Sequence, residues 1–148
     1  MTNRGIIDRA RSEHRKALTE IEAKELLKQA GISVVETKLA TTREEAITIS
    51  QQLGFPVVLK IASPDVIHKS DAGGVKLGLK TAKQVGKAYD DVLKAIRQKY
   101  PEAKIQGVSV QKMARPGVEV IIGMSEDAQF GPVLMFGLGG ILVEILKD

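Results

Sequence analysis

The chain has 148 residues, of which 43% are hydrophobic and 27% charged, values typical of a globular protein with one domain or two small lobes. It has no cysteine, which excludes disulfides and thiolate metal sites and fits a reducing cytoplasm. No apolar run approaches the ~20 residues that span a bilayer. We therefore expect a cytoplasmic protein that has no membrane partner.

The net charge is +4, and much of the basic excess falls between Arg4 and Lys16. We interpret residues 1–17 as a charged, solvated helical arm. Aromatic residues make up only 3% of the chain, and none is interleaved with these bases to stack on nucleobases. The composition therefore predicts no nucleic-acid partner and favours a small anionic ligand such as a nucleotide.

Helix signals recur along the first hundred residues. Three segments each begin with a threonine that is followed three residues later by Glu or Gln, the capping-box pattern. Each segment is closed by a glycine or a proline. The predicted helices cover residues 20–30, 43–53 and 82–100.

Strand signals occupy most of the remaining chain. Residues 57–61 form a β-branched apolar run that predicts a buried strand, and residues 75–79 alternate, which predicts one exposed face. Turn signals at 115–117, 125–127, 131–132 and 137–140 separate the later strands. The predicted strands cover residues 33–38, 57–61, 75–79, 105–113, 118–124, 133–136 and 141–146.

The order of these elements lacks strict βα alternation. A doubly wound parallel sheet is therefore disfavoured, and we predict an α+β fold of two small lobes hinged near residues 111–117. The last predicted strand runs almost to Asp148, and a terminal strand would leave an exposed edge. We expect either a trimmed chain or a partner that completes the sheet.

Lys60 interrupts an apolar strand, and a charge there is costly unless the strand end opens on a site. The alternative is a lysine that simply reaches solvent. The loop that follows contains Lys69, Gly73 and Gly74, whose ammonium and backbone N–H groups can bind phosphate oxygens. A tight hairpin is the alternative for the glycine pair. No P-loop or G-x-G-x-x-G pattern occurs, so those routes to nucleotide binding are excluded.

His68 lies in the same loop, between Asp65, Lys69 and Asp71. Imidazole is one of the few side chains that can attack phosphorus near neutral pH. A carboxylate bonded to one ring nitrogen would orient the other for attack. Two interpretations stay open: a phosphoryl carrier and a plain surface residue.

Further candidates lie downstream. Backbone groups of Gln111, Lys112 and Met113 can read an adenine edge, with the Met113 side chain against the base, or the segment is a hinge without a ligand. Glu119 is either a ribose ligand or a surface residue. Glu144, inside an apolar run, is either an edge residue or a cleft carboxylate.

Three motifs together resemble one family. Residues 55–60 followed by 68–75, residues 131–144, and the helix of residues 22–31 are similar to the ATP-grasp domain of NDP-forming acyl-CoA synthetases. The resemblance extends over residues 10–148. It implies an ATP-grasp-like fold with nucleotide held between two lobes. Residues 18–112 would form the N-terminal subdomain, and residues 113–148 the start of an incomplete C-terminal subdomain.

The resemblance also implies an activity. Enzymes of this family convert acyl-CoA, ADP and phosphate to free acid, CoA and ATP, and they pass the phosphoryl group through a histidine of a separate CoA-binding α subunit or domain. ATP/ADP and Mg²⁺ would be the cofactors, the assembly a hetero-oligomer, and acetate the acid by analogy.

Residue roles follow from the same resemblance. Lys60 would bind the nucleotide phosphates, helped by Lys69, and Gly73 and Gly74 would form the loop that covers them. Gln111 to Met113 would hold the adenine and Glu119 the ribose. His68 would take the phosphoryl group before ADP does.

The chain departs from the family at its C-terminal end. The family's magnesium ligands lie further along a longer domain, and only Glu144 and Asp148 are candidates to assist a metal here. We therefore expect no catalysis by the chain without its missing part and its CoA-binding partner. A ligand-sensing ATP-grasp domain of a protein lysine acetyltransferase is one alternative, although the intact His68 favours the enzyme. A non-catalytic basic interaction module is the other.

Overall fold

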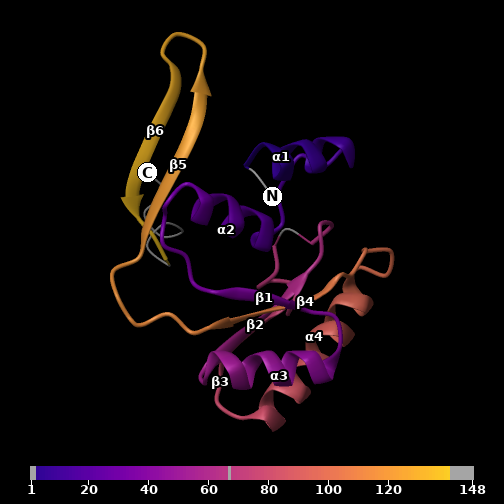
Figure 1. Ribbon diagram of the computed structural model, residues 1–148. Helices are drawn as coiled ribbons and strands as arrows, with labels where there is room; N and C mark the ends of the chain where they lie inside the picture. The colour runs from indigo at the N-terminus through magenta and orange to yellow at the C-terminus, as the bar shows by residue number, and fades with distance from the viewer. Residues whose placement is uncertain (1–2, 67, 141–148) are drawn as a thin grey trace. The chain divides into compact units, whose positions relative to one another are not determined.

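The computed structural model describes residues 3–66 and 68–140 (Figure 1). The chain divides into two compact units between Ala114 and Arg115, within the predicted hinge. The predicted arm, residues 1–17, belongs to the same unit as residues 18–112.

The first unit contains the helices, and each predicted helix is confirmed to within about one residue. Threonines 19, 42 and 81 cap α2, α3 and α4, and each side chain accepts a hydrogen bond from the backbone N–H three residues further on. Such a cap satisfies one of the free N–H groups of the first turn. The helices are α1 (Asn3–Ser12), α2 (Glu20–Gln29), α3 (Arg43–Leu53) and α4 (Ala82–Lys99).

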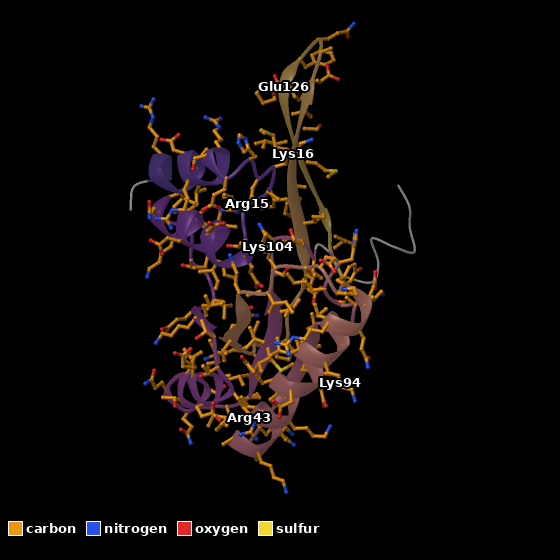
Figure 2. The ribbon with its side chains drawn as sticks, turned by 90° about the vertical axis from the view of Figure 1, so that its right-hand side faces the viewer. Arg15, Lys16, Arg43, Lys94, Lys104 and Glu126 are labelled. Atoms are coloured by element: carbon orange, nitrogen blue, oxygen red, sulfur yellow. The ribbon has the colours of Figure 1, made fainter. Side chains whose placement is uncertain are left out.

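The N-terminal arm is helical, but it is not fully solvated. Ile6 and Ala10 on α1 are only 4% and 5% exposed, because α1 contacts α2 and buries one of its faces. The basic side chains of the unit come from different elements. Arg15 and Lys16 follow α1, whereas Arg43 and Lys94 lie on α3 and α4 (Figure 2).

The sheet of the first unit has four antiparallel strands in the order β1-β4-β2-β3. The strand predicted at 33–38 lies later, because pairing with β4 begins only at Thr37, opposite Gln111. The other strands of this unit fall where they were predicted, β4 with shorter bounds. They are β1 (Thr37–Ala40), β2 (Val57–Ala62), β3 (Val75–Leu79) and β4 (Gly107–Lys112).

The alternation predicted for β3 is broken. Leu77 is 65% exposed, although a regular strand would place it with Val75 and Leu79. The pairing of β3 with β2 shifts by one residue, because Leu59 lies opposite Lys76 while Val57 lies opposite Leu79. This β-bulge in β3 changes the face of the sheet to which the following side chains point.

Helices α3 and α4 cover one face of the sheet, and α2 lies on the other side (Figure 1). Alternate residues of β2 and β4 point towards α3 and α4, where they meet the apolar stripe of α4. The fully buried residues of this core include Val57, Leu59, Ile61, Val85, Val92, Ile96, Val108 and Val110. The opposite face of the same strands carries Lys60, Ser109 and Gln111 beside the buried Val58 and Ala62.

Over residues 115–140, which the structure describes, the second unit forms one antiparallel hairpin of β5 (Val120–Asp127) and β6 (Gly131–Leu138). The turn signals predicted at 125–127 and 131–132 are wrong, because these residues pair across the hairpin and extend β5 and β6. The Asp127 carboxylate accepts hydrogen bonds from the N–H groups of Gln129 and Phe130, which closes the turn instead at 128–130.

Apolar side chains of the hairpin are widely exposed, as Ile122 (72%) and Phe136 (73%) illustrate. The strand predicted at 141–146, together with Glu144 and Asp148, lies outside the described residues. Within residues 3–66 and 68–140, no helix combines the length and the apolar character that a membrane span requires.

Candidate functional site

Lys60 and Gln111 lie on the same face of the sheet, the one turned away from the core. Lys60 pairs opposite Ser109 across β2 and β4, and Gln111 is two residues further along β4. Because side chains alternate between faces, Ser109, Gln111 and Lys60 point to the same side. The Lys60 side chain is 25% exposed, so it does not simply extend into solvent.

The first turn of α2 lies next to this face of the sheet, and a cap fixes the conformation of that turn. Thr19 and Glu22 form a reciprocal capping box. The two terminal guanidinium nitrogens of Arg15, Nη1 and Nη2, donate to the Glu22 carboxylate at 2.9 and 2.7 Å. The hydrogen bonds from Arg15, together with those from the backbone N–H and hydroxyl of Thr19, lower the pKa of Glu22 to about 2. A bidentate pair of this kind holds the first turn of α2 in place.

Glu20, in that first turn, forms ion pairs with three ammonium groups. Its carboxylate lies 2.7 Å from Nζ of Lys60, 3.1 Å from Nζ of Lys24 and 3.7 Å from Nζ of Lys69. Burial raises the pKa of Glu20, but the hydrogen bonds and positive charges of Lys60 and Lys24 outweigh it, and the pKa is lowered overall. Glu20 is therefore ionised, and the cluster keeps a clear excess of positive charge.

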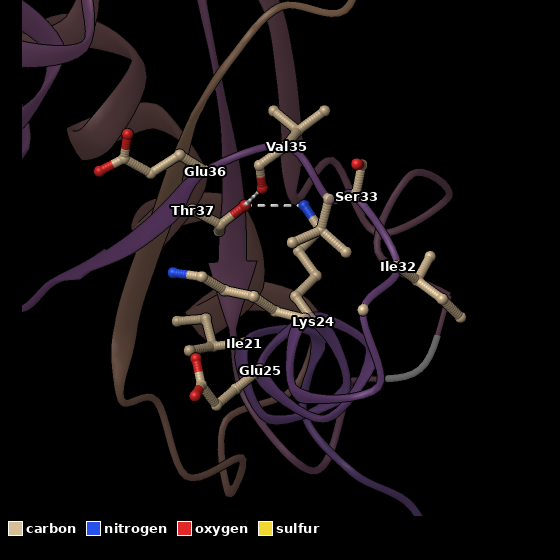
Figure 3. Close-up of a pocket in the computed structure, with 11 residues that line it drawn as sticks. Ile21, Lys24, Glu25, Ile32, Ser33, Val35, Glu36 and Thr37 are labelled. Carbon is tan, nitrogen blue, oxygen red and sulfur yellow. Dashed lines mark hydrogen bonds between the residues drawn. The ribbon is translucent and has the colours of Figure 1, made fainter.

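Lys24 links this cluster to β1 and β4. Its ammonium group donates to Oγ1 of Thr37 at 2.7 Å (Figure 3) and also to Oε1 of Gln111. The Gln111 side chain is thus engaged with a lysine. The adenine contact predicted for Gln111 to Met113 involves their backbone groups, so this side-chain hydrogen bond does not test it.

Sequence reasoning missed both Glu20 and Lys24. They are four residues apart, so they lie on one face of α2 and form an i,i+4 ion pair. That spacing could have marked them as neighbours. Only the packing of α2 over β2 and β4 places them beside Lys60 and Gln111.

An open cavity of about 520 Å³ lies between α2 and the segment from Gly31 to Thr37 (Figure 3). Lys24 and Thr37 belong to its wall together with apolar side chains such as Ile21 and Val35. The cavity therefore borders the lysine cluster on one side.

The glycine loop behaves differently from the prediction. The N–H of Gly73 donates to the Ser70 carbonyl at 3.0 Å, and the N–H of Gly74 donates to the Lys69 carbonyl at 2.7 Å. Both donors are thus used inside the loop, and the predicted display of these N–H groups to phosphate is not what the structure contains. Gly74 is buried, and a Cβ there would lie 2.7 Å from Ile61 Cγ2. The loop needs glycine for close packing, which sets the position of Lys69.

His68 is exposed and adjoins Lys69 in the loop. Its carbonyl accepts the Ala72 N–H at 3.3 Å. The Asp65 carboxylate accepts the backbone N–H of Lys104 at 2.7 Å, so it is used elsewhere. Among the described residues, no hydrogen bond joins the His68 ring to a carboxylate. The imidazole is accessible, and in this part of the structure no carboxylate orients its ring.

The sequence also predicted ligands further along the chain. The Met113 N–H donates to the Pro56 carbonyl at 3.0 Å, which removes one backbone donor from any base. Lys112 is exposed at the end of β4. Glu119 belongs to the second unit, where its carbonyl accepts the Gly139 N–H at 2.8 Å. Glu144 lies outside the described residues.

Metal ligands are sparse in the part of the chain that the structure describes. There, no group of three or more His, Cys, Asp or Glu side chains is close enough to hold a metal ion. Glu20, the carboxylate at the cluster, is already surrounded by ammonium groups. These residues do not by themselves fit a Mg²⁺ site, whereas the lysines fit phosphate oxygens well.

Known proteins resemble this chain over almost its whole length. The β subunit of an ADP-forming acetate–CoA ligase from Pyrococcus furiosus is 51% identical over 145 residues, which are 98% of this chain and 62% of that protein. The chain thus spans less than two thirds of this relative.

Solved structures of other proteins also match this chain over almost its whole length. The dinucleotide-forming acetyl-coenzyme A synthetase 1 of Ca. Korarchaeum cryptofilum, in complex with coenzyme A, Ca-AMPCP and HgCl⁺, matches with a TM-score of 0.94 and 48% identity, over 99% of this chain and 64% of that chain. A second structure of that enzyme contains coenzyme A and Mg-AMPPCP, with its phosphohistidine segment pointing towards the nucleotide binding site. It matches with a TM-score of 0.81 and 45% identity, over 99% and 62% of the two chains.

The family match extends over the lysine cluster, the glycine loop and the hairpin together. Residues 9–148 match the ATP-grasp domain family. The α+β class and the ATP-grasp fold predicted from the sequence are thereby confirmed. The chain belongs to the ATP-grasp domain family.

Proposed function

We propose that this chain is the nucleotide-handling part of an ADP-forming acyl-CoA synthetase, with acetate as the acid. The observation that carries the proposal is the cluster of part-buried ammonium groups, among them Lys60 and Lys69, that share the single carboxylate of Glu20. Such an excess of positive charge on part-buried side chains suits the phosphates of ADP or ATP.

The chemical step in this proposal is the transfer of a phosphoryl group from a phosphohistidine to ADP. The P–N bond breaks, a β-phosphate oxygen of ADP forms the new P–O bond, and the imidazole nitrogen takes up a proton. Phosphoryl transfer depends mainly on positioning and charge neutralisation, and the lysines provide both. His68 is the proposed carrier on this chain, because it is exposed and adjoins Lys69.

Other roles remain part of the proposal. Gly73 and Gly74 shape the loop over the phosphates, Gln111 to Met113 border the adenine, and Glu119 binds the ribose. The internal hydrogen bonds of the two glycines favour the Lys60 and Lys69 side chains over backbone N–H groups as the phosphate ligands.

We further propose a CoA-binding α subunit or domain, which carries its own phosphohistidine, as the partner in a hetero-oligomer. The Pyrococcus furiosus relative, named a β subunit, supports this assembly. A relative bound to Mg-AMPPCP supports Mg²⁺ as the metal, with Glu144 as a candidate ligand. A cytoplasmic location remains a prediction of the cysteine-free composition.

The chain offers an internal control for the role of His68. It has two histidines, His68 and His14, and both are exposed. Phosphoramidate, a small phosphoryl donor, would load both side chains. In an assembly that also contains the predicted C-terminal part and the CoA-binding partner, ADP with MgCl₂ should then discharge His68 and form ATP, while His14 keeps its phosphate, as measured by ³¹P NMR and peptide mass spectrometry. Discharge of both histidines at equal rates, or of neither, would contradict the carrier role.

Nucleotide binding needs a separate measurement. Calorimetry with ADP on the same chain tests the lysine cluster, whether or not His68 transfers phosphate. If ADP binds but His68 is never discharged, the cluster remains a binding site and the carrier assignment fails.

A further inference from the structure

We propose that Lys24 and Glu20 belong to the phosphate site: Lys24 as its third ammonium ligand, and Glu20 as an internal anion that holds the lysines until phosphate replaces it. The inference rests on the proposed function and deepens it, because it assigns two residues on α2 to the site formed by Lys60 and the glycine loop.

Lys24 has the same surroundings as the two lysines already assigned. The Lys24, Lys60 and Lys69 side chains are 21%, 25% and 22% exposed, and each lies within 4 Å of the Glu20 carboxylate. Thr37 and Gln111 accept hydrogen bonds from Lys24 and fix the direction of its ammonium group. A lysine held in this way presents its charge without losing further side-chain freedom on binding.

The charges at the cluster do not balance. Within the described part of the chain, one carboxylate faces three ammonium groups, and Lys69 is its most distant partner at 3.7 Å. A polyphosphate carries more charge and more acceptor oxygens than a carboxylate, so it can satisfy all three lysines together. Glu20 and a bound phosphate would repel each other, which makes Glu20 a competitor for the site.

Glu20 can leave the lysines without unwinding α2. The cap of the helix is made by Thr19 and Glu22, and Arg15 secures Glu22. The Glu20 backbone therefore stays in place while its side chain rotates away. The fixed first turn returns the carboxylate to the lysines once the phosphate has gone.

Inorganic triphosphate and ADP are the probes, measured by calorimetry on the full chain. Lys24→Met should weaken triphosphate binding about tenfold, and Lys24→Arg should restore most of it. Glu20→Gln should tighten binding about tenfold and steepen its salt dependence, because a competing charge is removed. The matched controls are Lys28→Met and Glu25→Gln, which make the same changes at exposed positions of α2. Both should bind within about twofold of the wild type.

Two results would overturn the inference. Equal or weaker triphosphate binding by Glu20→Gln would show that Glu20 does not compete. Wild-type binding by Lys24→Met would remove Lys24 from the site. If Lys60→Met still abolishes binding in those cases, the proposed function stands. If the folded wild type binds neither triphosphate nor ADP, the proposed function fails and this inference fails with it. Circular dichroism of each variant identifies any loss of fold, and Lys24→Arg then carries the test for Lys24.

Discussion

The carboxylate of Glu20 lies 2.7 Å from Nζ of Lys60, forty residues further along the chain. Glu20 is in the first turn of a capped helix, and Lys60 is on a strand whose neighbouring residues are buried. The pair explains how a charged side chain is tolerated on β2, since a paired charge costs far less than an isolated one. It also places the start of α2 at the candidate phosphate site.

Replacing Lys60 by methionine should weaken ADP binding at least about tenfold, because an ammonium partner of the phosphates is lost. Glu20 keeps Lys24 and Lys69 as partners, so no carboxylate is left unpaired. Calorimetry measures the change. Lys38→Met is the control, because Lys38 is 44% exposed and pairs with Glu36. Equal ADP affinity in the two variants would remove Lys60 from the site.

The Arg15–Glu22 pair should make stability depend on pH. The pKa of Glu22 is lowered from 4.5 to about 2, so its stabilisation is present above pH 4.5 and is lost as the pH falls towards 2. The shift sets an upper limit of about 3 kcal/mol, and partial exposure to solvent reduces the expected value to about 1–2 kcal/mol.

Urea unfolding at a series of pH values tests this pair. Arg15→Met should be less stable than the wild type by up to that amount above pH 4.5, because the Thr19 hydrogen bonds to Glu22 remain, and the two proteins should converge near pH 2. A difference that stays constant from pH 7 to about 2 would show that Arg15 stabilises the fold by packing instead of by its charge.

Gly74→Ala should destabilise the first unit by about 2–3 kcal/mol. The new Cβ would lie 2.7 Å from Ile61 Cγ2 and 2.9 Å from the Lys69 carbonyl, and the backbone cannot easily move away. Gly73→Ala is the comparison, because its φ of +71° is strained for alanine but its Cβ would meet only Ala95 at 3.4 Å. We expect about 1 kcal/mol there. Equal losses in urea unfolding would rule out close packing as the reason for Gly74.

Replacing a side chain by alanine should lower the unfolding free energy more in the core than in the hairpin. Ile96→Ala should cost about 3 kcal/mol of unfolding free energy, because the Ile96 side chain is fully buried between α4 and the sheet. Phe136→Ala should cost less than about 0.5 kcal/mol, since Phe136 is 73% exposed on β6. Thermal unfolding followed by circular dichroism compares them. A large loss for Phe136→Ala would mean that its ring is covered in solution.

The sequence by itself determined the elements whose signals are local. The caps at Thr19, Thr42 and Thr81 join residues three apart, so the order of residues alone was enough to locate the helices. The apolar run of β2, with Lys60 within it, was also identified from the sequence alone. So was the loop that contains His68 and Lys69, because each motif lies within a few consecutive residues.

Only the tertiary structure decided which of these residues meet. Glu20 and Lys60 are forty residues apart, and their contact depends on how α2 packs over β2. The bulge that exposes Leu77 depends on the register between β2 and β3, which no local pattern encodes. The sequence predicted that the N–H groups of Gly73 and Gly74 would be free to bind phosphate. In the folded loop they donate to backbone carbonyls instead. Local hydrogen-bond patterns fix helices and turns, whereas packing between distant segments fixes a site.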